Sequence, residues 1–272
     1  MEGQSVALLL LLAALPCRAQ PDPAALLRQM GEAEKRNRQD SAYFVYVEDI
    51  RSLRGNAAQP PRQASWITYE VTFLEGETYH RPVARDGKPL RPEQCQFEDE
   101  RFQQVSEYRR STPLEERRRR YFAAEENRYR IDSAIAIEHH EAQLLGADKV
   151  NGRDVWVVAA QPRRGTPKPK RRSEWSLCQK LKYWIDQETH LPVRIEAEQL
   201  YDYDGTRKGA ISSVETVNVE GVLLPERITS TTRSKSGRAQ TSVIIEQKYS
   251  AYKRFRTETV LLFGDPSLSS RF

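Results

Sequence analysis

The side chains best able to carry chemistry in this chain are four histidines, three cysteines and many carboxylates. His139, His140 and Glu141 are adjacent. Adjacent residues do not share one face of a helix or strand, so this run does not form an HExxH metal site. The sequence also contains no GxSxG nucleophile motif and no Gly-rich phosphate loop. These observations favour a binding protein over an enzyme, and we predict no catalytic residue, metal site or cofactor.

Two other groups of reactive side chains have simpler interpretations. The segment Asp202-Tyr203-Asp204-Gly205 resembles part of a calcium loop, but it lacks the later ligand positions and fits a hairpin turn better. Cys95 and Cys178 remain once an N-terminal leader is removed. In an oxidising compartment they could pair, and two inert buried cysteines are an alternative of at least equal weight.

The N-terminus has the pattern of an export signal. Residues 6–15 form an unbroken apolar run that is too short to span a bilayer and has the length of a signal-peptide core. Small residues precede a cut after Ala19. We therefore predict a signal peptide over 1–19 and a periplasmic mature chain, 20–272. The residues before Cys17 do not match a lipobox, so no lipid anchor is predicted there.

Composition limits the class of protein further. The chain has 272 residues, 38% hydrophobic and 30% charged, with 12 Tyr, 8 Phe and 4 Trp, which is too aromatic for a disordered chain. The length fits one domain. The net charge of +5 is small, and much of the positive charge is clustered in two basic runs. We interpret 117–120 as a solvated helix face paired with nearby Glu, and 162–172 as a charged loop, so no nucleic-acid partner is expected.

Helices are expected in two regions that flank the first strands. Asp22 can cap a helix whose first residue is Pro23. A second helical region, crowded with Glu, Arg and Gln, is predicted as two helices at about 92–109 and 113–128, the second opening with capping-box spacing at Thr112. Together they form a helical insert at about 92–130.

Strand patterns occupy much of the remaining chain. Residues 42–47 are rich in β-formers, and residues 67–74 alternate apolar and polar side chains with a loop at 55–63 between them. From Ile137 onward, turn pairs separate long β-rich segments. These pairs are Asn151-Gly152, Asp204-Gly205, Glu220-Gly221 and Ser236-Gly237. Long antiparallel strands must twist and curl, so we predict an α+β fold: a strongly curved antiparallel sheet with helices covering its concave face.

Several of these turns and strand starts resemble a known family. The motifs are Tyr183-Trp184-Ile185-Asp186, Leu191-Pro192-Val193-Arg194-Ile195-Glu196 and Glu220-Gly221-Val222-Leu223-Leu224-Pro225. They are similar to those of LolA/LolB-like lipoprotein-sorting carriers and their RseB/MucB-related relatives, in an uncharacterised bacterial branch. The resemblance covers most of the mature chain and implies an unclosed β-barrel whose cavity holds lipid or lipoprotein acyl chains. The helical insert exceeds what a minimal carrier needs, which suggests a different cargo or partner.

Cavity residues follow from strand alternation combined with this resemblance. Inward-facing apolar side chains would bind acyl chains, because each buried CH₂ contributes about 0.8 kcal/mol. The candidates are Ile67, Tyr69, Val71, Phe73, Val193, Ile195 and Ala197. For each of them an ordinary core position is the alternative interpretation. A basic rim would also permit peripheral membrane contact through anionic head groups.

Three other functions remain open. The same fold could serve as an RseB-like sensor that binds a membrane-protein partner of the cell envelope. It could also be a hydrolase whose catalytic groups are scattered through the sequence, or a structural envelope protein with a filled core.

Overall fold

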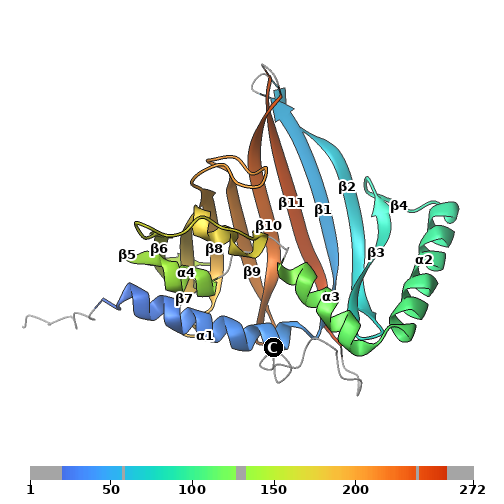
Figure 1. Cartoon of the computed structure of the whole chain (residues 1–272), viewed down its shortest axis with the longest axis horizontal. Helices are drawn as coiled ribbons and strands as arrows, with labels where there is room; N and C mark the ends of the chain where they lie inside the picture. Colours follow the sequence, from blue (N-terminus) through green and yellow to red (C-terminus); the bar gives the residue numbers. More distant parts are fainter. Residues whose placement is uncertain (1–19, 57–58, 127–132, 237–238, 256–272) are drawn as a thin grey trace, which may run out of the picture.

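The computed structural model describes residues 20–56, 59–126, 133–236 and 239–255. Its strands form a single antiparallel sheet of eleven strands, which stays open because β4 and β5 stand at its two edges (Figure 1). The predicted α+β fold with an unclosed sheet is therefore confirmed. The strands are β1 Phe44–Asn56, β2 Gln59–Leu74, β3 Glu77–Arg85, β4 Lys88–Pro89, β5 His140–Val150, β6 Arg153–Pro162, β7 Gln179–Asp186, β8 Pro192–Gln199, β9 Ile211–Val219, β10 Val222–Ser236 and β11 Ala239–Arg254.

Strand order explains how the sheet is assembled from local hairpins. The order is β4-β3-β2-β1-β11-β10-β9-β8-β7-β6-β5, so every neighbour except one is also a neighbour in sequence. The exception is the pair β1 and β11, which joins the two series of hairpins in the middle of the sheet. The four long strands β10, β11, β1 and β2 extend together to the tip at the top of Figure 1.

Helices pack on both halves of the sheet. They are α1 Pro23–Ser41, α2 Pro92–Ser111, α3 Leu114–Glu126, α4 Ser133–His139 and the 3-10 helix η1 Arg172–Cys178. Helices α1 and α4 contact strands from β5 to β10, and α2 contacts β3. Asp22 caps α1 as predicted, because its carboxylate accepts from the backbone N–H groups of Ala24 and Ala25. The two helices expected at about 92–109 and 113–128 are present. The last residues of the expected insert, and the expected signal peptide, lie outside the described residues.

The main core lies where α1 and α4 pack on β6, β7 and β8. It joins Leu26, Leu27 and Met30 of α1 to Tyr183 and Ile195 of the sheet. These side chains are nearly inaccessible to solvent, so this part of the sheet face is filled by protein. A second cluster continues from Ala33 through Leu191 and Leu223, and a third joins Phe44 to Val222 and Leu224. Asn37 fixes α1 there, since its side chain exchanges two hydrogen bonds with the backbone of Leu223.

Tight turns form at the predicted pairs within the described residues. Asn151 has a φ of 49° and Gly152 a φ of 80°, the left-handed backbone that two-residue hairpins require. A similar turn joins β3 to β4 at Asp86-Gly87. There a Cβ on Gly87 would lie 2.6 Å from the ring of Trp66, so both the backbone angle and the packing require glycine.

One local prediction was wrong. The expected loop at 55–63 is mostly strand: Arg54 pairs with Arg62, and Asn56 with Gln59. Prolines fit there because β3 pairs with β2 only from Ile67 onward, so no described strand pairs with this stretch of β2 on its other side. At Thr112, where a capping box was expected, the hydroxyl donates to the carbonyl of Tyr108 at the end of α2.

Candidate functional site

The seven predicted cavity residues can be placed by following the strand pairing across the sheet. Directly paired residues on adjacent strands lie on the same face. One row of such pairs crosses the sheet from Ile195 through Val214, Ile228, Gln247 and Ile50 to Ile67. Because Ile195 packs beneath α1 and α4, Ile67 lies on this same helix-bearing face.

The two ends of that face differ in what covers them. Ile195 and Ala197 belong to the core beneath α1 and α4 and are almost fully buried. Ile67, Tyr69 and Phe73 are partly exposed, whereas Val71 is buried. The helix-bearing face is thus filled at β8 and retains accessible apolar surface at β2.

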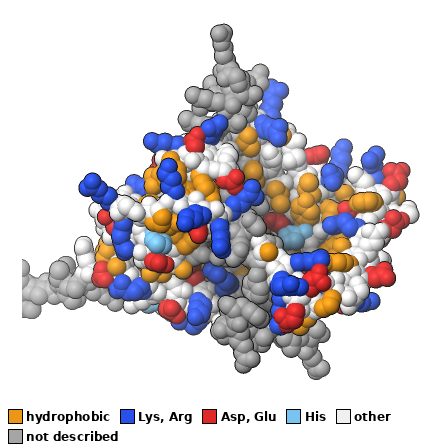
Figure 2. All heavy atoms as spheres, viewed as in Figure 1, with side chains coloured by type: hydrophobic (Ala, Val, Ile, Leu, Met, Phe, Trp, Pro, Cys, Tyr) orange, Lys and Arg blue, Asp and Glu red, His pale blue; other side chains and the backbone are white. Residues whose placement is uncertain are grey.

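We call the accessible part of this face the aromatic half-face. It is defined by the partly exposed side chains of Tyr46, Ile67, Tyr69, Phe73 and Tyr249. Figure 2 shows hydrophobic side chains gathered over the region of β1 to β3, beside atoms that are not described. Aromatic contacts order it: Tyr46 and Tyr249 have ring centroids 5.7 Å apart, and Phe73 lies 5.2 Å from Phe255.

Val193 occupies a different environment from the other six candidates. It lies at a bulge, between the pair of Ile185 with Pro192 and the pair of Trp184 with Arg194. It contributes to the second core cluster and also lines an open pocket of about 660 Å³. That pocket is bordered by charges of both signs, which are Asp49, Arg194, Glu215, Glu226, Arg227 and Lys248.

A buried carboxylate lies at the edge of the aromatic half-face. Glu48 pairs with Tyr249 on one side and Tyr69 on the other, and only 5% of the residue is exposed. Its carboxylate lies 3.3 Å from Nδ1 of His80 and accepts a hydrogen bond from the Tyr249 hydroxyl. Burial, with the negative charge of Glu48, raises the pKa of the Tyr249 phenol far above its usual value. Burial likewise raises the pKa of Tyr252. These phenols therefore act as neutral hydrogen-bond donors.

Sequence reasoning did not single out Glu48, although a signal was present. Tyr46, Glu48 and Ile50 alternate along one strand, which places the carboxylate on the same side as apolar neighbours. A charged residue at such a position is uncommon in a strand with one buried face. The same alternation correctly separates Glu48 from Asp49, whose carboxylate accepts from Trp66 and Thr68.

The helices α2 and α3 are fixed to the β2–β3 turn by arginines. Arg109 donates to the carbonyls of Leu74, Glu77 and Thr78, and Arg117 pairs with the carboxylate of Glu77. Arg118 and Arg120 pair with Glu115 and Glu116 as expected, but Arg117 is only 11% exposed. The interpretation of the whole run as a solvated helix face was therefore wrong at Arg117 and at Arg118, whose side chain is 16% exposed. At its other side α3 contacts η1, which lies on the far half of the sheet.

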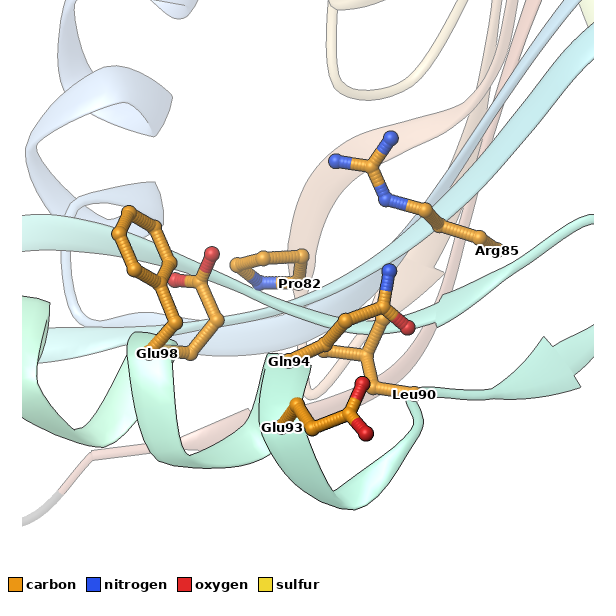
Figure 3. Close-up of a pocket in the computed structure, with 7 residues that line it drawn as sticks. Pro82, Arg85, Leu90, Glu93, Gln94 and Glu98 are labelled. Carbon is orange, nitrogen blue, oxygen red and sulfur yellow. The ribbon is translucent and has the colours of Figure 1, made fainter.

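A smaller pocket lies between α2 and the β3–β4 hairpin. Its volume is about 230 Å³, and its lining includes Pro82, Leu90 and the exposed ring of Phe97. Figure 3 shows Arg85 entering from the strand side and Glu93 from the first turn of α2. The pocket is open and mixed in character, which suits contact with another molecule at the surface.

The residues considered first for chemistry have structural roles. His140 is buried, and its Nε2 lies 3.1 Å from the backbone oxygen of Gln179. Cys95 is exposed and Cys178 is buried, and neither is in a disulfide. Within the described residues, no group of three or more His, Cys, Asp or Glu side chains could hold a metal ion. No helix in the described part of the chain has the length and apolar character needed to span a bilayer.

Comparison with known proteins gives one family and several similar structures. A family model described as "uncharacterized protein" matches residues 100–256. No curated protein matches the sequence. A LolA superfamily protein from Nitrosomonas europaea is 12% identical, with a TM-score of 0.35 over 88% of this chain and 96% of that chain.

Two further solved structures belong to the groups named by the sequence motifs. A putative outer membrane lipoprotein-sorting protein domain from Vibrio parahaemolyticus is 14% identical, with a TM-score of 0.36 over 89% of this chain and 98% of that chain. The Pseudomonas aeruginosa MucA/MucB complex gives 11% identity and a TM-score of 0.25 over 87% of this chain and 100% of that chain. These structures come from the LolA-like and MucB-like groups whose motifs the sequence resembles.

Proposed function

We propose that this chain is an exported, non-enzymatic protein that binds acyl chains. It belongs to the family whose model, described as "uncharacterized protein", spans residues 100–256. The observation that carries the proposal is the unequal covering of one sheet face. Helices α1 and α4 fill that face over β6 to β8. The aromatic half-face keeps partly exposed apolar side chains on the same side.

The energetics suit a flexible apolar ligand. An acyl chain laid on the aromatic half-face would gain about 0.8 kcal/mol of binding free energy for each CH₂ group it buries. A chain of about eight to ten carbons would therefore offset the entropic cost of its own ordering. Ile67, Tyr69, Val71 and Phe73 supply the β2 part of this surface in our proposal. Ile195 and Ala197 would support it from beneath α1 and α4, and Val193 from the neighbouring bulge.

The proposed location is the periplasm. The apolar run at 6–15 followed by small residues supports export. Lipid or lipoprotein acyl chains are the apolar ligands expected at a cell envelope, and transient contact with a membrane surface would deliver them.

Binding is tested with the full mature chain and the neutral fluorescent probe N-phenylnaphthylamine. We expect its emission to rise on binding and to fall again when dodecanol displaces it. Native mass spectrometry of protein purified from envelope extract should show acylated adducts. If the probe does not bind and no adduct is found, the carrier proposal is wrong.

The variant Ile67→Glu should weaken probe binding at least about tenfold, because it places a charge on the apolar surface. Val45→Glu is its matched control. Val45 alternates with Tyr46 on β1 and pairs with Lys253, so the new carboxylate lies on the opposite face beside a cation. Equal loss in both folded variants would mean that the aromatic half-face is not the binding surface.

A second function is favoured by the surface of α2. Phe97 is 63% exposed and borders the pocket shown in Figure 3, an arrangement that suits an inserted side chain of an envelope protein. We propose this as the basis of an alternative, sensor-like role in which the protein binds a membrane-protein partner.

This role is tested by placing a photo-crosslinking amino acid at Phe97 and, as a control, at Glu188 in the β7–β8 turn. We expect one discrete protein adduct in cells from the first position and none from the second. Absence of an adduct at Phe97, or the same adducts from both positions, would contradict partner binding at α2.

A further inference from the structure

The strongest unexplained group in the molecule is the carboxylate of Glu48. Its side chain is only 7% exposed, and burying a lone negative charge is costly unless a positive group pairs with it. Among the described residues it has an ion pair with Nδ1 of His80 at 3.3 Å. That partner is a histidine whose side chain is 47% exposed, so it lies at the rim and not over the carboxylate's whole surface.

Tyrosines occupy the positions next to Glu48 on this face of the sheet. Tyr249 and Tyr69 are its direct cross-strand neighbours, and the Tyr46 ring lies 5.7 Å from that of Tyr249. The ring of Tyr69 in turn lies 6.1 Å from that of His80. Three partly exposed phenol side chains therefore occupy positions next to one buried carboxylate on the same face.

This combination has a specific recognition chemistry. The faces of aromatic rings attract cations, and an aromatic cage beside a carboxylate suits an organic ammonium group. An anionic head group would instead be repelled by Glu48 and would meet neutral phenols. Burial raises the pKa of Tyr249, which keeps its hydroxyl protonated and its hydrogen bond directed at the carboxylate.

We propose that Glu48, with the rings of Tyr46, Tyr69 and Tyr249, binds the ammonium head of an amphiphile whose acyl chain lies along the aromatic half-face. This inference rests on the proposed acyl-binding function and adds the chemical class of the head group. The ammonium supplies a permanent positive charge beside the carboxylate, and the acyl chain lies across the aromatic half-face from there.

The test compares three ligands with the same twelve-carbon chain and different heads: dodecyltrimethylammonium, dodecanol and laurate. Each is titrated against N-phenylnaphthylamine bound to the full mature chain, with the two charged ligands kept below their micelle concentrations and dodecanol below its solubility limit. We expect dodecyltrimethylammonium to bind at least about tenfold more tightly than dodecanol, and laurate to bind more weakly than both. Equal affinities would overturn the ammonium site and leave acyl binding intact. Failure of all three would instead overturn acyl binding.

Charge and shape at the site are separated by Glu48→Gln, which keeps the size of the side chain and removes its charge. We expect it to abolish the preference for ammonium and to leave the affinity for dodecanol within about twofold. Glu70→Gln is the matched control, since Glu70 is exposed, alternates with Tyr69 on β2 and lies on the opposite face. A preserved ammonium preference in Glu48→Gln would contradict the proposal, as would its equal loss in the control.

The aromatic contribution is tested at Tyr69 without changing any charge. Tyr69→Phe retains the ring and should keep the preference for ammonium, whereas Tyr69→Leu should reduce that preference several-fold with little effect on dodecanol. The same preference in both variants would show that Tyr69 takes no part in recognising the head group.

Discussion

His140 shows how a single residue with reactive chemistry serves stability. It is 2% exposed, and its Nε2 meets the backbone oxygen of Gln179. Burial lowers the pKa of the imidazole from its usual 6.5, although the backbone hydrogen bond to Gln179 raises it in part. The unfolded chain therefore binds a proton more readily than the folded protein does. The contribution of His140 to stability is therefore fully present above the pKa of the unfolded chain and decreases as the pH falls below that value.

We expect the free energy of unfolding to fall between pH 7.5 and 5.5, by at most about 1.4 kcal/mol from this residue. His140→Gln should be less stable at pH 7.5 and should lose less on acidification. Urea denaturation at the two pH values measures both effects. Asp186, whose pKa is lowered by hydrogen bonds from Thr189 and Arg153 despite burial, does not contribute here because its unfolded pKa of 3.8 lies below this range.

The control for this prediction is His190→Asn. His190 has a φ of 58°, a left-handed conformation that Asn tolerates well, so the turn should be retained. This variant should keep the wild-type dependence on pH. The same dependence in His140→Gln as in the wild type would mean that another group causes it.

At the scale of elements, α3 is positioned by a few arginine contacts with the sheet. Arg117 donates to the backbone oxygens of Arg109 and Glu75 at 3.0 and 2.5 Å and also pairs with Glu77. One planar guanidinium thus ties the end of α2, the β2–β3 turn and α3 together. Since α3 also contacts η1, its anchoring sets how this helix lies between the two halves of the sheet.

We expect Arg117→Ala to reduce the free energy of unfolding by about 1–3 kcal/mol, because it leaves the buried carbonyls and Glu77 without their donor. The free energy of unfolding of Arg117→Lys should lie between those of the wild type and Arg117→Ala, since lysine cannot reproduce the several directed hydrogen bonds of the guanidinium. Arg120→Ala is the control: Arg120 is 59% exposed and its pair with Glu116 contributes less than about 1 kcal/mol. Chemical denaturation of all three variants measures these differences, and equal losses would contradict an anchoring role for Arg117.

The elements also show where sequence patterns lose their predictive power. Period-two alternation and Asn-Gly turns are local signals, so strands such as β6 and the turn at Asn151 were predictable. The spacing of Arg117 from nearby Glu residues suggested pairing within its own helix, which is also a local signal. That interpretation was wrong because Arg117 pairs instead with Glu77 of β3. The prolines in 55–63 suggested a loop, but pairing with β1 forms strand there, and β3 does not reach this stretch, so the prolines are tolerated.

At the scale of the whole molecule, the succession of long strands and tight turns was enough to predict the sheet. It was not enough to predict which part of the sheet the helices cover. Strand register places Ile67 and Ile195 on one face of the sheet. Only the packing of α1 and α4 shows that Ile195 is under helices while Ile67 stays partly exposed. The Glu48 site was missed for a related reason, since its partners Tyr249 and His80 come from strands far apart in sequence.

The single non-sequential strand pair has a consequence for how the protein folds. Partners such as Phe44 and Arg254 lie near opposite ends of the described chain, and such distant pairing slows folding because a long loop must close first. The hairpins β1 to β4 can form early, but β1 keeps an unpaired edge until β11 has been synthesised. Until β11 pairs with it, this edge can pair with a neighbouring copy, which favours aggregation of partly folded chains.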